Sequence, residues 1–510
     1  MADVAVRQAP GLGTKLVYGL GSVAFGTKDA GFATFLLIFY NQVLGLSATL
    51  VSFAIMLALV ADALFDPIIG EISDNWRSRL GRRHPFMYAS ALPVAGFYFL
   101  LWNPPHWQSA ALFAYLVAIA ILVRISIACY EIPSAALAPE LSHDYDQRTS
   151  LMAFRWLFGA LGNGVTLAVA LVFFMTATKA QPTGILNRDG YFAYSIMAAL
   201  VMFTSILVSA SGTHSRIRFM RQLPVRHHPT LAKLAREMFE SLSHRSLLMV
   251  TISSLFGGMA LGLGAVLNAY FGTYFWRFTP QQLSVIGLGA LLAAAIAVPL
   301  APLISAKLDK RRGYIAAAFA SLFVNNIAMT LKLFGLLPPD GSTALLVVFF
   351  ATITIGLALA ITSGILITSM IADVVEDSEL RTGRRSEGLF SASLSFVAKA
   401  TSGLGILLAG VLIDVVHFPK YASPATIDIV APHAVRNLVL IYMPIQITLW
   451  IVSIVLVGGY RIDRKLHEHN LHRLAEAAAL ADASPAGLVV AGATGSVGEA
   501  AANSAMRDMA

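Results

Sequence analysis

The sequence predicts an all-α membrane protein in which twelve transmembrane helices form two six-helix, pseudo-symmetric bundles. Of the 510 residues, 57% are hydrophobic and only 13% are charged, whereas soluble proteins average about 25% charged residues. The mean hydropathy of +0.71 agrees with a bilayer as the solvent. Apolar runs of about 20 residues recur along the chain, and charged motifs of the first half return in the second half.

Each predicted helix is an apolar run bounded by charged or Pro/Gly-rich breaks. The runs begin near Leu16, Ala48, Pro85, Ser109, Ser150, Tyr191, Ser246, Gln281, Tyr314, Ser342, Gly388 and Ala434. The chain therefore divides into a cytoplasmic N-terminus (1–15), an N-terminal six-helix bundle (16–211), a basic cytoplasmic linker (212–245), a C-terminal six-helix bundle (246–459) and a disordered cytoplasmic tail (460–510). The linker is either an amphipathic helix at the membrane surface or a solvated connection.

The basic residues indicate membrane topology rather than nucleic-acid binding. The net charge is +8 and the isoelectric point is near 9.5, but Lys and Arg lie in short bursts between apolar runs. With the N-terminus inside, most of the 36 Lys and Arg residues fall in segments that the helix map makes cytoplasmic. We therefore expect a multi-pass protein of the cell (inner) membrane with both termini in the cytoplasm and no nucleic-acid partner.

A weak internal repeat relates the two halves. Four charged or hydroxyl positions of the first half recur in the second half at a constant spacing of 233 residues. They are Glu140, Asp144, Arg148 and Thr149, which return as Asp373, Asp377, Arg381 and Thr382. Parallel halves around a central site are a common plan of membrane transporters.

Two aspartates in the second predicted helix are candidates for a cation site. Asp62 and Asp66 are four residues apart, so they share one helical face, and each would be costly to bury in a bilayer without a function. Two close carboxylates repel each other, so together they favour binding a proton or another small cation. The structural alternative is that the aspartates form ion bridges with Lys28, Arg124 or Lys399.

Other charged residues in the predicted helices suit a polar solute. Asp29 and Glu131 can accept hydrogen bonds from a polyol, while Lys28, Arg155 and Lys399 can donate them or balance charge. Pro133, just after Glu131, loosens its helix because it lacks a backbone N–H group. Arg124 lies seven residues before Glu131 on the same face, and charge compensation between the two is an equal alternative to a functional role.

In order and helix position, these residues resemble the glycoside-pentoside-hexuronide:cation symporters of the major facilitator superfamily, the family of the melibiose carrier. The resemblance covers about residues 12–460. Its motifs are Lys28-Asp29, Asp62-Ala-Leu-Phe-Asp66-Pro, Asp74-Asn-Trp-Arg-Ser-Arg-Leu-Gly-Arg-Arg, Glu131-Ile-Pro, Arg155, Ile371-Ala-Asp-Val-Val-Glu-Asp, Thr382-Gly-Arg-Arg-Ser-Glu-Gly and Lys399.

The resemblance implies the major facilitator fold and alternating access. It places the cation at Asp62 and Asp66. It implies that Lys399 links this site to a substrate site formed by Asp29, Glu131 and Arg155. It also implies a cytoplasmic gate made of Asp74, Arg148, Asp373 and Arg381. We expect Arg124 to be a second coupling residue and Lys28 to be a fourth residue of the substrate site.

Three departures from the family pattern bear on the cation and the substrate. Phe65 stands where sodium-using relatives tend to have an amide, and Ala128 stands where they tend to have a hydroxyl residue. Sodium needs several oxygen ligands whereas a carboxylate pair suffices for a proton, so the sequence favours H+ over Na+, with Na+ at Asp62 and Asp66 as the alternative. Sugar carriers of the family usually have an aromatic residue shortly after the acid of the fourth helix, here Glu131. This chain has Ser134-Ala135-Ala136 instead, so the sequence does not decide whether the substrate is a sugar.

We therefore expect a secondary active symporter, not an enzyme, that moves a sugar or glycoside inward with a cation and needs no cofactor. The expected partners are a small-molecule solute and the lipid bilayer, and the protein is expected to be a monomer. One alternative is a symporter of a lipid-like or amphiphilic solute. Another is a polytopic, magnesium-dependent prenyl-transferring enzyme that uses an Asp-x-x-x-Asp pair such as Asp373 and Asp377.

Overall fold

The computed structural model describes residues 10–142, 144–178, 181, 183–217, 245–382, 387–420 and 424–459. Twelve helices in these ranges are long and apolar enough to cross a membrane, and no strand occurs in them, so the predicted fold class is confirmed. The linker from 218 to 244, the tail from 460 and residues 1–9 lie outside the described residues.

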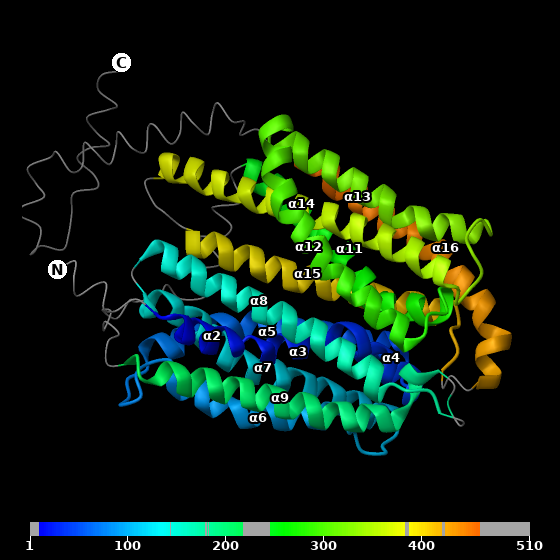
Figure 1. Ribbon diagram of the computed structural model, residues 1–510, viewed down its shortest axis with the longest axis horizontal. Helices are drawn as coiled ribbons and strands as arrows, with labels where there is room; N and C mark the ends of the chain where they lie inside the picture. Colours follow the sequence, from blue (N-terminus) through cyan, green and yellow to red (C-terminus); the bar gives the residue numbers. More distant parts are fainter. Residues whose placement is uncertain are drawn as a thin grey trace, which may run out of the picture.

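The N-terminal bundle holds the first six crossings (Figure 1). The first crossing is assembled from five short helical segments, and the next five are longer helices. In order these are α2 (Leu12–Leu20), α3 (Val23–Ala30), η1 (Gly31–Phe35), α4 (Leu36–Ile38) and η2 (Phe39–Val43), then α5 (Ala48–Asn75), α6 (His84–Trp102), α7 (Ser109–Leu141), α8 (Tyr145–Val169) continued by η3 (Ala170–Phe174), η4 (Gly184–Leu186) and α9 (Arg188–His214).

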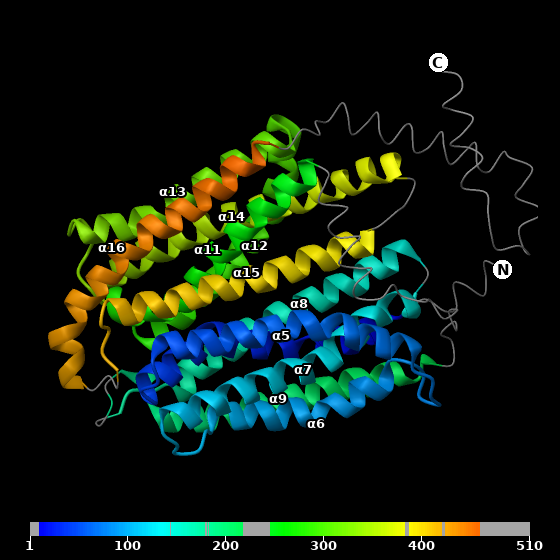
Figure 2. The same ribbon diagram turned by 180° about the vertical axis from the view of Figure 1, so that it is seen from behind.

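The C-terminal bundle repeats this arrangement. It consists of α11 (Arg245–Tyr270) continued by η6 (Phe271–Phe275), α12 (Pro280–Leu308), α13 (Lys310–Leu333), α14 (Thr343–Thr382), α15 (Glu387–Val415) and α16 (Pro424–Val457). Helix α3 packs on α8, α5 on α7 and α6 on α9, and the equivalent pairs α11–α15, α12–α14 and α13–α16 form the other bundle. The two bundles lie side by side in both views (Figures 1 and 2), joined by the equivalent contacts α5–α15 and α8–α12.

Four helices begin at least four residues earlier than the hydropathy pattern predicts: α8 begins at Tyr145 instead of Ser150, α13 begins at Lys310 instead of Tyr314, and α2 and α16 are shifted as follows. Helix α2 begins at Leu12 instead of Leu16, since Lys15 can lie inside it by donating a hydrogen bond of 2.9 Å to the Ser150 hydroxyl. Helix α16 begins at Pro424 instead of Ala434, because proline is well tolerated in the first turn of a helix. Both shifts add polar turns to otherwise apolar crossings.

Polar contacts between the bundles gather where α4 and η2 complete the first crossing, here called the α4 end; the opposite end, where α2 begins, is called the α2 end (Figure 1). The Tyr270 hydroxyl donates to Asn41 Oδ1 at 2.8 Å, and the Tyr274 hydroxyl donates to Gln42 Oε1 at 3.2 Å. Asp414, near the end of α15, accepts hydrogen bonds from the first residues around α5. These contacts hold the two bundles together at the α4 end.

Candidate functional site

An ion cluster lies where α5 and α7 of the N-terminal bundle meet α15 of the C-terminal bundle. Asp62 Oδ2 is 3.2 Å from Arg124 Nη1 and 2.9 Å from Lys399 Nζ. The same Lys399 ammonium forms an ion pair with Asp66. Asp62 is buried, with 5% of its surface exposed, whereas the Asp66 and Lys399 side chains are 27% and 29% exposed. The structure thus joins both candidate cation ligands to both residues expected to couple them.

The local sequence explains how Lys399 reaches across from the other bundle. Asp62 and Asp66 are one helical turn apart, so both carboxylates face α15. Glycines on α15 let the two helices approach closely: a Cβ atom at Gly410 would lie 2.4 Å from the Ala48 carbonyl, and one at Gly403 would lie 3.0 Å from Met56 Cγ. Lys399 lies on the same face of α15, four residues before Gly403, and faces the two aspartates of α5.

The predicted substrate residues lie along α3 and its neighbours. Lys28 Nζ is 2.9 Å from Asp29 Oδ1; the lysine side chain is buried, but the aspartate side chain is 53% exposed. The Arg124 guanidinium lies over the Phe32 ring at 4.8 Å. Arg155 lies over the Phe25 ring at 5.1 Å, so two arginines of the N-terminal bundle pack on the segment that carries the Lys28–Asp29 pair.

Arg155 and Glu131 come together through the backbone rather than through their charges. Arg155 donates to the Ser134 hydroxyl at 3.0 Å and to the Glu131 carbonyl at 3.1 Å. The half-buried Glu131 carboxylate has no hydrogen-bond or ion-pair partner within the described part of the chain. The backbone therefore orients Arg155, while the acid next to it keeps its acceptor oxygens available.

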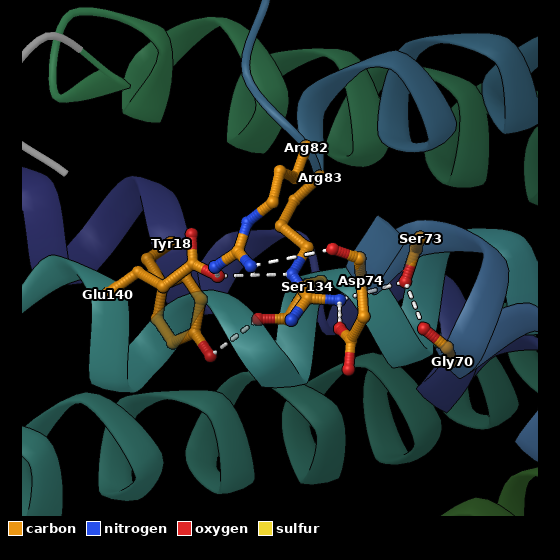
Figure 3. A network of polar contacts seen from close by, with 8 residues as sticks. All are labelled: Tyr18, Gly70, Ser73, Asp74, Arg82, Arg83, Ser134 and Glu140. Carbon is orange, nitrogen blue, oxygen red and sulfur yellow. Dashed lines mark hydrogen bonds and ion pairs between the residues drawn. The ribbon is translucent and has the colours of Figure 1, made fainter. Parts of the chain in front are cut away.

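A second cluster lies at the α2 end of the N-terminal bundle (Figure 3). Arg83 pairs with Asp74 and donates to the Ser73 hydroxyl at 2.8 Å and to Glu140 Oε1 at 3.2 Å. Arg82 Nη2 lies 2.8 Å from the same Glu140 oxygen. The cluster fastens the Asp74–Arg83 connection to α7 within one bundle.

Three of the four residues predicted to form a cytoplasmic gate contact partners within their own bundles. Asp74 pairs with Arg83, and Arg148 donates to the Ser142 carbonyl at 2.8 Å, both within the N-terminal bundle. Asp373 pairs with Lys310 at 2.7 Å within the C-terminal bundle. The side chain of Arg381 lies outside the described residues.

The neighbours of the aspartates offer little to a metal ion. Among the described residues, no group of three or more His, Cys, Asp or Glu side chains is placed to hold one. Phe65 and Ala128 have no side-chain oxygen, and Asp62 Oδ2 and Asp66 Oδ2 both face Lys399. In this structure both aspartates are therefore paired with basic side chains.

The sequence interpretation missed several residues of the site. Phe25, Phe32 and Ser134 contact its arginines, and the Tyr18 hydroxyl donates to the Ser134 carbonyl at 3.0 Å. The chain has 30 phenylalanines, and hydrophobic periodicity does not distinguish Phe25 and Phe32 from the others. The one available signal is that Phe25 and Phe32 flank Lys28-Asp29 on the same crossing.

Comparison with known proteins agrees with this fold. The chain is 24% identical to the isoprimeverose transporter of Lactiplantibacillus pentosus, over 78% of this chain and 79% of that one. It is 24% identical to the putative glycoside/cation symporter YagG of Escherichia coli (92% and 98% covered) and 22% identical to the sodium-dependent lysophosphatidylcholine symporter 1 of Gallus gallus (90% and 88% covered). A crystal structure of a bacterial homologue of the iron transporter ferroportin in an inward-facing state matches the fold with a TM-score of 0.60, at 15% identity and with 87% and 98% of the chains covered.

The family itself is shown by a match over most of the chain. Residues 17–464 fit the model described as MFS/sugar transport protein. The relatives are transporters, so the prenyl-transferring alternative is set aside and the expectation of a non-enzyme is confirmed. The chain belongs to the MFS/sugar transport protein family and is a symporter of the glycoside-pentoside-hexuronide:cation type within the major facilitator superfamily.

Proposed function

We propose that this symporter moves a sugar or glycoside inward by alternating access, driven by a cation that loads at Asp62 and Asp66. The observation that carries the proposal is Lys399, which reaches from the C-terminal bundle to both carboxylates of the N-terminal bundle. A change in the charge of either carboxylate therefore acts directly on a contact between the two moving parts. Such a contact is what links ion binding to a change between conformations.

The groups of the cluster support a proton over sodium. Two carboxylates, Asp62 and Asp66, already face two cations, Arg124 and Lys399, with Lys28 and its partner Asp29 on a neighbouring helix. A sodium ion and a proton each add one positive charge, but a sodium ion also needs several oxygen ligands and would find few neutral ones here. A proton on Asp66 would instead remove one of the two ion pairs of Lys399 and leave the pair with Asp62.

The solute is proposed to bind beside this cluster. The exposed Asp29 and the unpartnered Glu131 supply acceptors for sugar hydroxyls, while Lys28 and Arg155 hold the local charge and orientation. Arg124 touches both parts, because it pairs with Asp62 and packs on Phe32, one turn from Lys28. Loading of the cation would thus alter the position of groups next to the solute.

The remaining expectations on topology belong to the same proposal. We place both termini and the α2 end in the cytoplasm of a cell bounded by an inner membrane, with the protein acting as a monomer. Asp74, Arg148, Asp373 and Arg381 would close the α2 end in the state that opens the α4 end. In that state, the residues that now pair within each bundle would exchange some of their partners for groups of the other bundle.

Transport by purified protein in vesicles tests the proposal. A panel of radiolabelled glycosides is offered while a proton gradient or a sodium gradient is imposed separately. We expect concentrative uptake with the proton gradient, and we expect Asp66→Asn to lose it while still equilibrating solute along its gradient. Glu71→Gln, an exposed acid five residues further along α5, is the matched control. Full uphill uptake by Asp66→Asn and Asp62→Asn would remove the cation role from these carboxylates.

A lipid-like solute is the second candidate because the chain resembles a lysophosphatidylcholine symporter over 90% of its length. The same vesicles decide between the two: lysophosphatidylcholine would be taken up with a sodium gradient, and the glycosides would not be taken up. That result would replace the glycoside proposal.

A further inference from the structure

A cavity of about 540 Å3 lies between the bundles, mostly within the C-terminal one, away from the charged cluster. Its walls come from α11, α12, α13, α14 and α16, with one side closed by the first crossing and by α8. Pockets that bind small molecules have volumes of about 300–1,000 Å3, so the cavity is large enough for part of a solute.

Small residues at one-turn spacing on α11 create this space. Ala260, Gly264, Asn268 and Gly272 follow one another every four residues and all line the cavity. A Cβ atom at Gly264 would meet only the Tyr442 hydroxyl, at 3.4 Å, so the wall opens into the cavity at this point. A helix with larger residues on this face would fill the space.

The chemistry of the walls selects an uncharged occupant. Among the described residues that line the cavity there is no Asp, Glu, Lys, Arg or His. Most of the lining is aliphatic or aromatic, and Trp450 presents a half-buried indole. A charged group would lose its hydration here without gaining a partner of opposite charge.

Amide side chains give the cavity a polar side. Asn325 and Asn326 donate to backbone carbonyls of their own helix, whereas Asn268, exposed near the end of α11, and Gln446, half-buried on α16, line the cavity without such a contact. Neither side chain has a hydrogen-bond partner within the ranges that the structure describes. Polar groups in membrane-spanning helices normally face a partner, water or a solute, so these amides are placed to hydrogen-bond the glycosidic oxygen at the edge of an otherwise apolar, uncharged occupant.

The cavity adjoins the proposed sugar site. Ala33 lines it, and Asp29 lies four residues earlier, one turn along the same crossing, with its carboxylate exposed. A solute bound by its hydroxyls at Asp29 would therefore reach the cavity with its other end. We propose that this transporter recognises glycosides with an apolar, uncharged aglycone, and that the cavity lined by Asn268, Gln446 and Trp450 binds that aglycone. This inference rests on the proposed function and adds the substrate class to it.

The experiment compares phenyl with methyl glycosides of the same sugars. Binding of the β-glucosides, β-galactosides and β-xylosides to the full chain in lipid nanodiscs is measured by calorimetry. We expect the phenyl compound to bind at least about tenfold more tightly than the methyl compound of the accepted sugar, because burial of an aromatic ring corresponds to a gain of this size or larger. Ala265→Phe, which fills the cavity, should abolish the difference, whereas Ala295→Phe on the exposed face of α12 should keep it.

A second variant guards against misfolding of the first. Gly287→Val also projects into the cavity, and its Cβ atom would meet only Leu167 at 3.6 Å, an ordinary contact. If Ala265→Phe binds no methyl glycoside, Gly287→Val decides the outcome. Equal binding of phenyl and methyl glycosides, or a phenyl preference that survives filling of the cavity, would overturn the inference but not the proposed function. Binding of lysophosphatidylcholine and of no glycoside in the panel would overturn both.

Discussion

Asp414 joins the two bundles at the α4 end, and removal of its charge should loosen this contact. Asp414 Oδ2 accepts hydrogen bonds from the Ser47 hydroxyl at 2.5 Å and the Thr49 amide at 2.9 Å; its other oxygen is 3.3 Å from the Ala48 amide. The carboxylate of α15 thus caps the N-terminus of α5 in the other bundle. Negative charge at this position also interacts favourably with the helix dipole.

The cost of Asp414→Asn follows from these contacts. Asparagine keeps one acceptor oxygen but loses the second one and the negative charge. A lost hydrogen bond of this type is worth about 1 kcal/mol, and the charge at the end of a helix is worth about 0.3–1 kcal/mol. The closed α4 end should therefore be destabilised by about 1–2 kcal/mol relative to the open state, which shifts the equilibrium by about 5–30-fold.

Distances between spin labels measure this shift. Labels at Trp107→Cys and Leu336→Cys, both exposed at the α4 end and in different bundles, are introduced with Cys129→Ala. Double electron–electron resonance should show a longer distance whose population rises in Asp414→Asn. Asp340→Asn is the matched control, because Asp340 lies at the same end but pairs with Lys332 of its own bundle. An unchanged distance distribution in Asp414→Asn would refute this reasoning.

Two further substitutions test the packing that positions the site. Gly410→Ala should reduce transport and cost about 1–3 kcal/mol by overpacking, because its Cβ atom would lie 2.2 Å from Ser52 Oγ. Gly96→Ala on α6 is the control: its Cβ atom would have no neighbour within 4 Å, so this variant should behave as the parent protein in uptake assays. Equal uptake by the two variants would mean that the α5–α15 approach does not matter. Arg83→Ala should lower the free energy of unfolding by about 2–3 kcal/mol, because it removes the Arg83–Asp74 and Arg83–Glu140 ion pairs, while the exposed Arg77→Ala should not. Thermal unfolding in detergent measures both, and a shared melting temperature would contradict the prediction.

The free-energy cost of placing a charge in a membrane explains which parts of the site the sequence could predict. Charged residues in apolar helices are expensive, so Asp62, Asp66 and Lys399 could be selected from the sequence alone, and helical spacing placed the two aspartates on one face. The partners of Asp373 and Asp74 could not be predicted, since any of several nearby basic residues would satisfy a carboxylate. The structure selects Lys310 and Arg83.

The cavity in the C-terminal bundle shows the limit of that reasoning. Placing an amide in a membrane costs much less free energy than placing a charge there. A search for ionisable groups therefore does not select Asn268 and Gln446. Their role depends on the empty space beside them, which arises from small residues of several helices at once. Periodicity along one helix can reveal a face of small residues, but it cannot reveal whether a neighbouring helix fills the space.

Two charged contacts between the bundles, those of Lys399 and Asp414, lie on the same pair of helices. Lys399 and Asp414 are fifteen residues apart on α15, a separation of about 22 Å along a helix, and their partners lie correspondingly spaced on α5. Between them, the glycines of α15 keep the two helices in contact. Loss of the Lys399 ion pairs would therefore leave the Asp414 cap and the glycine contact to hold α5 against α15. Since these remaining contacts lie toward the α4 end, a proton on Asp66 would loosen the α5–α15 contact on the side of the α2 end first, while Asp414 still caps α5 at the α4 end.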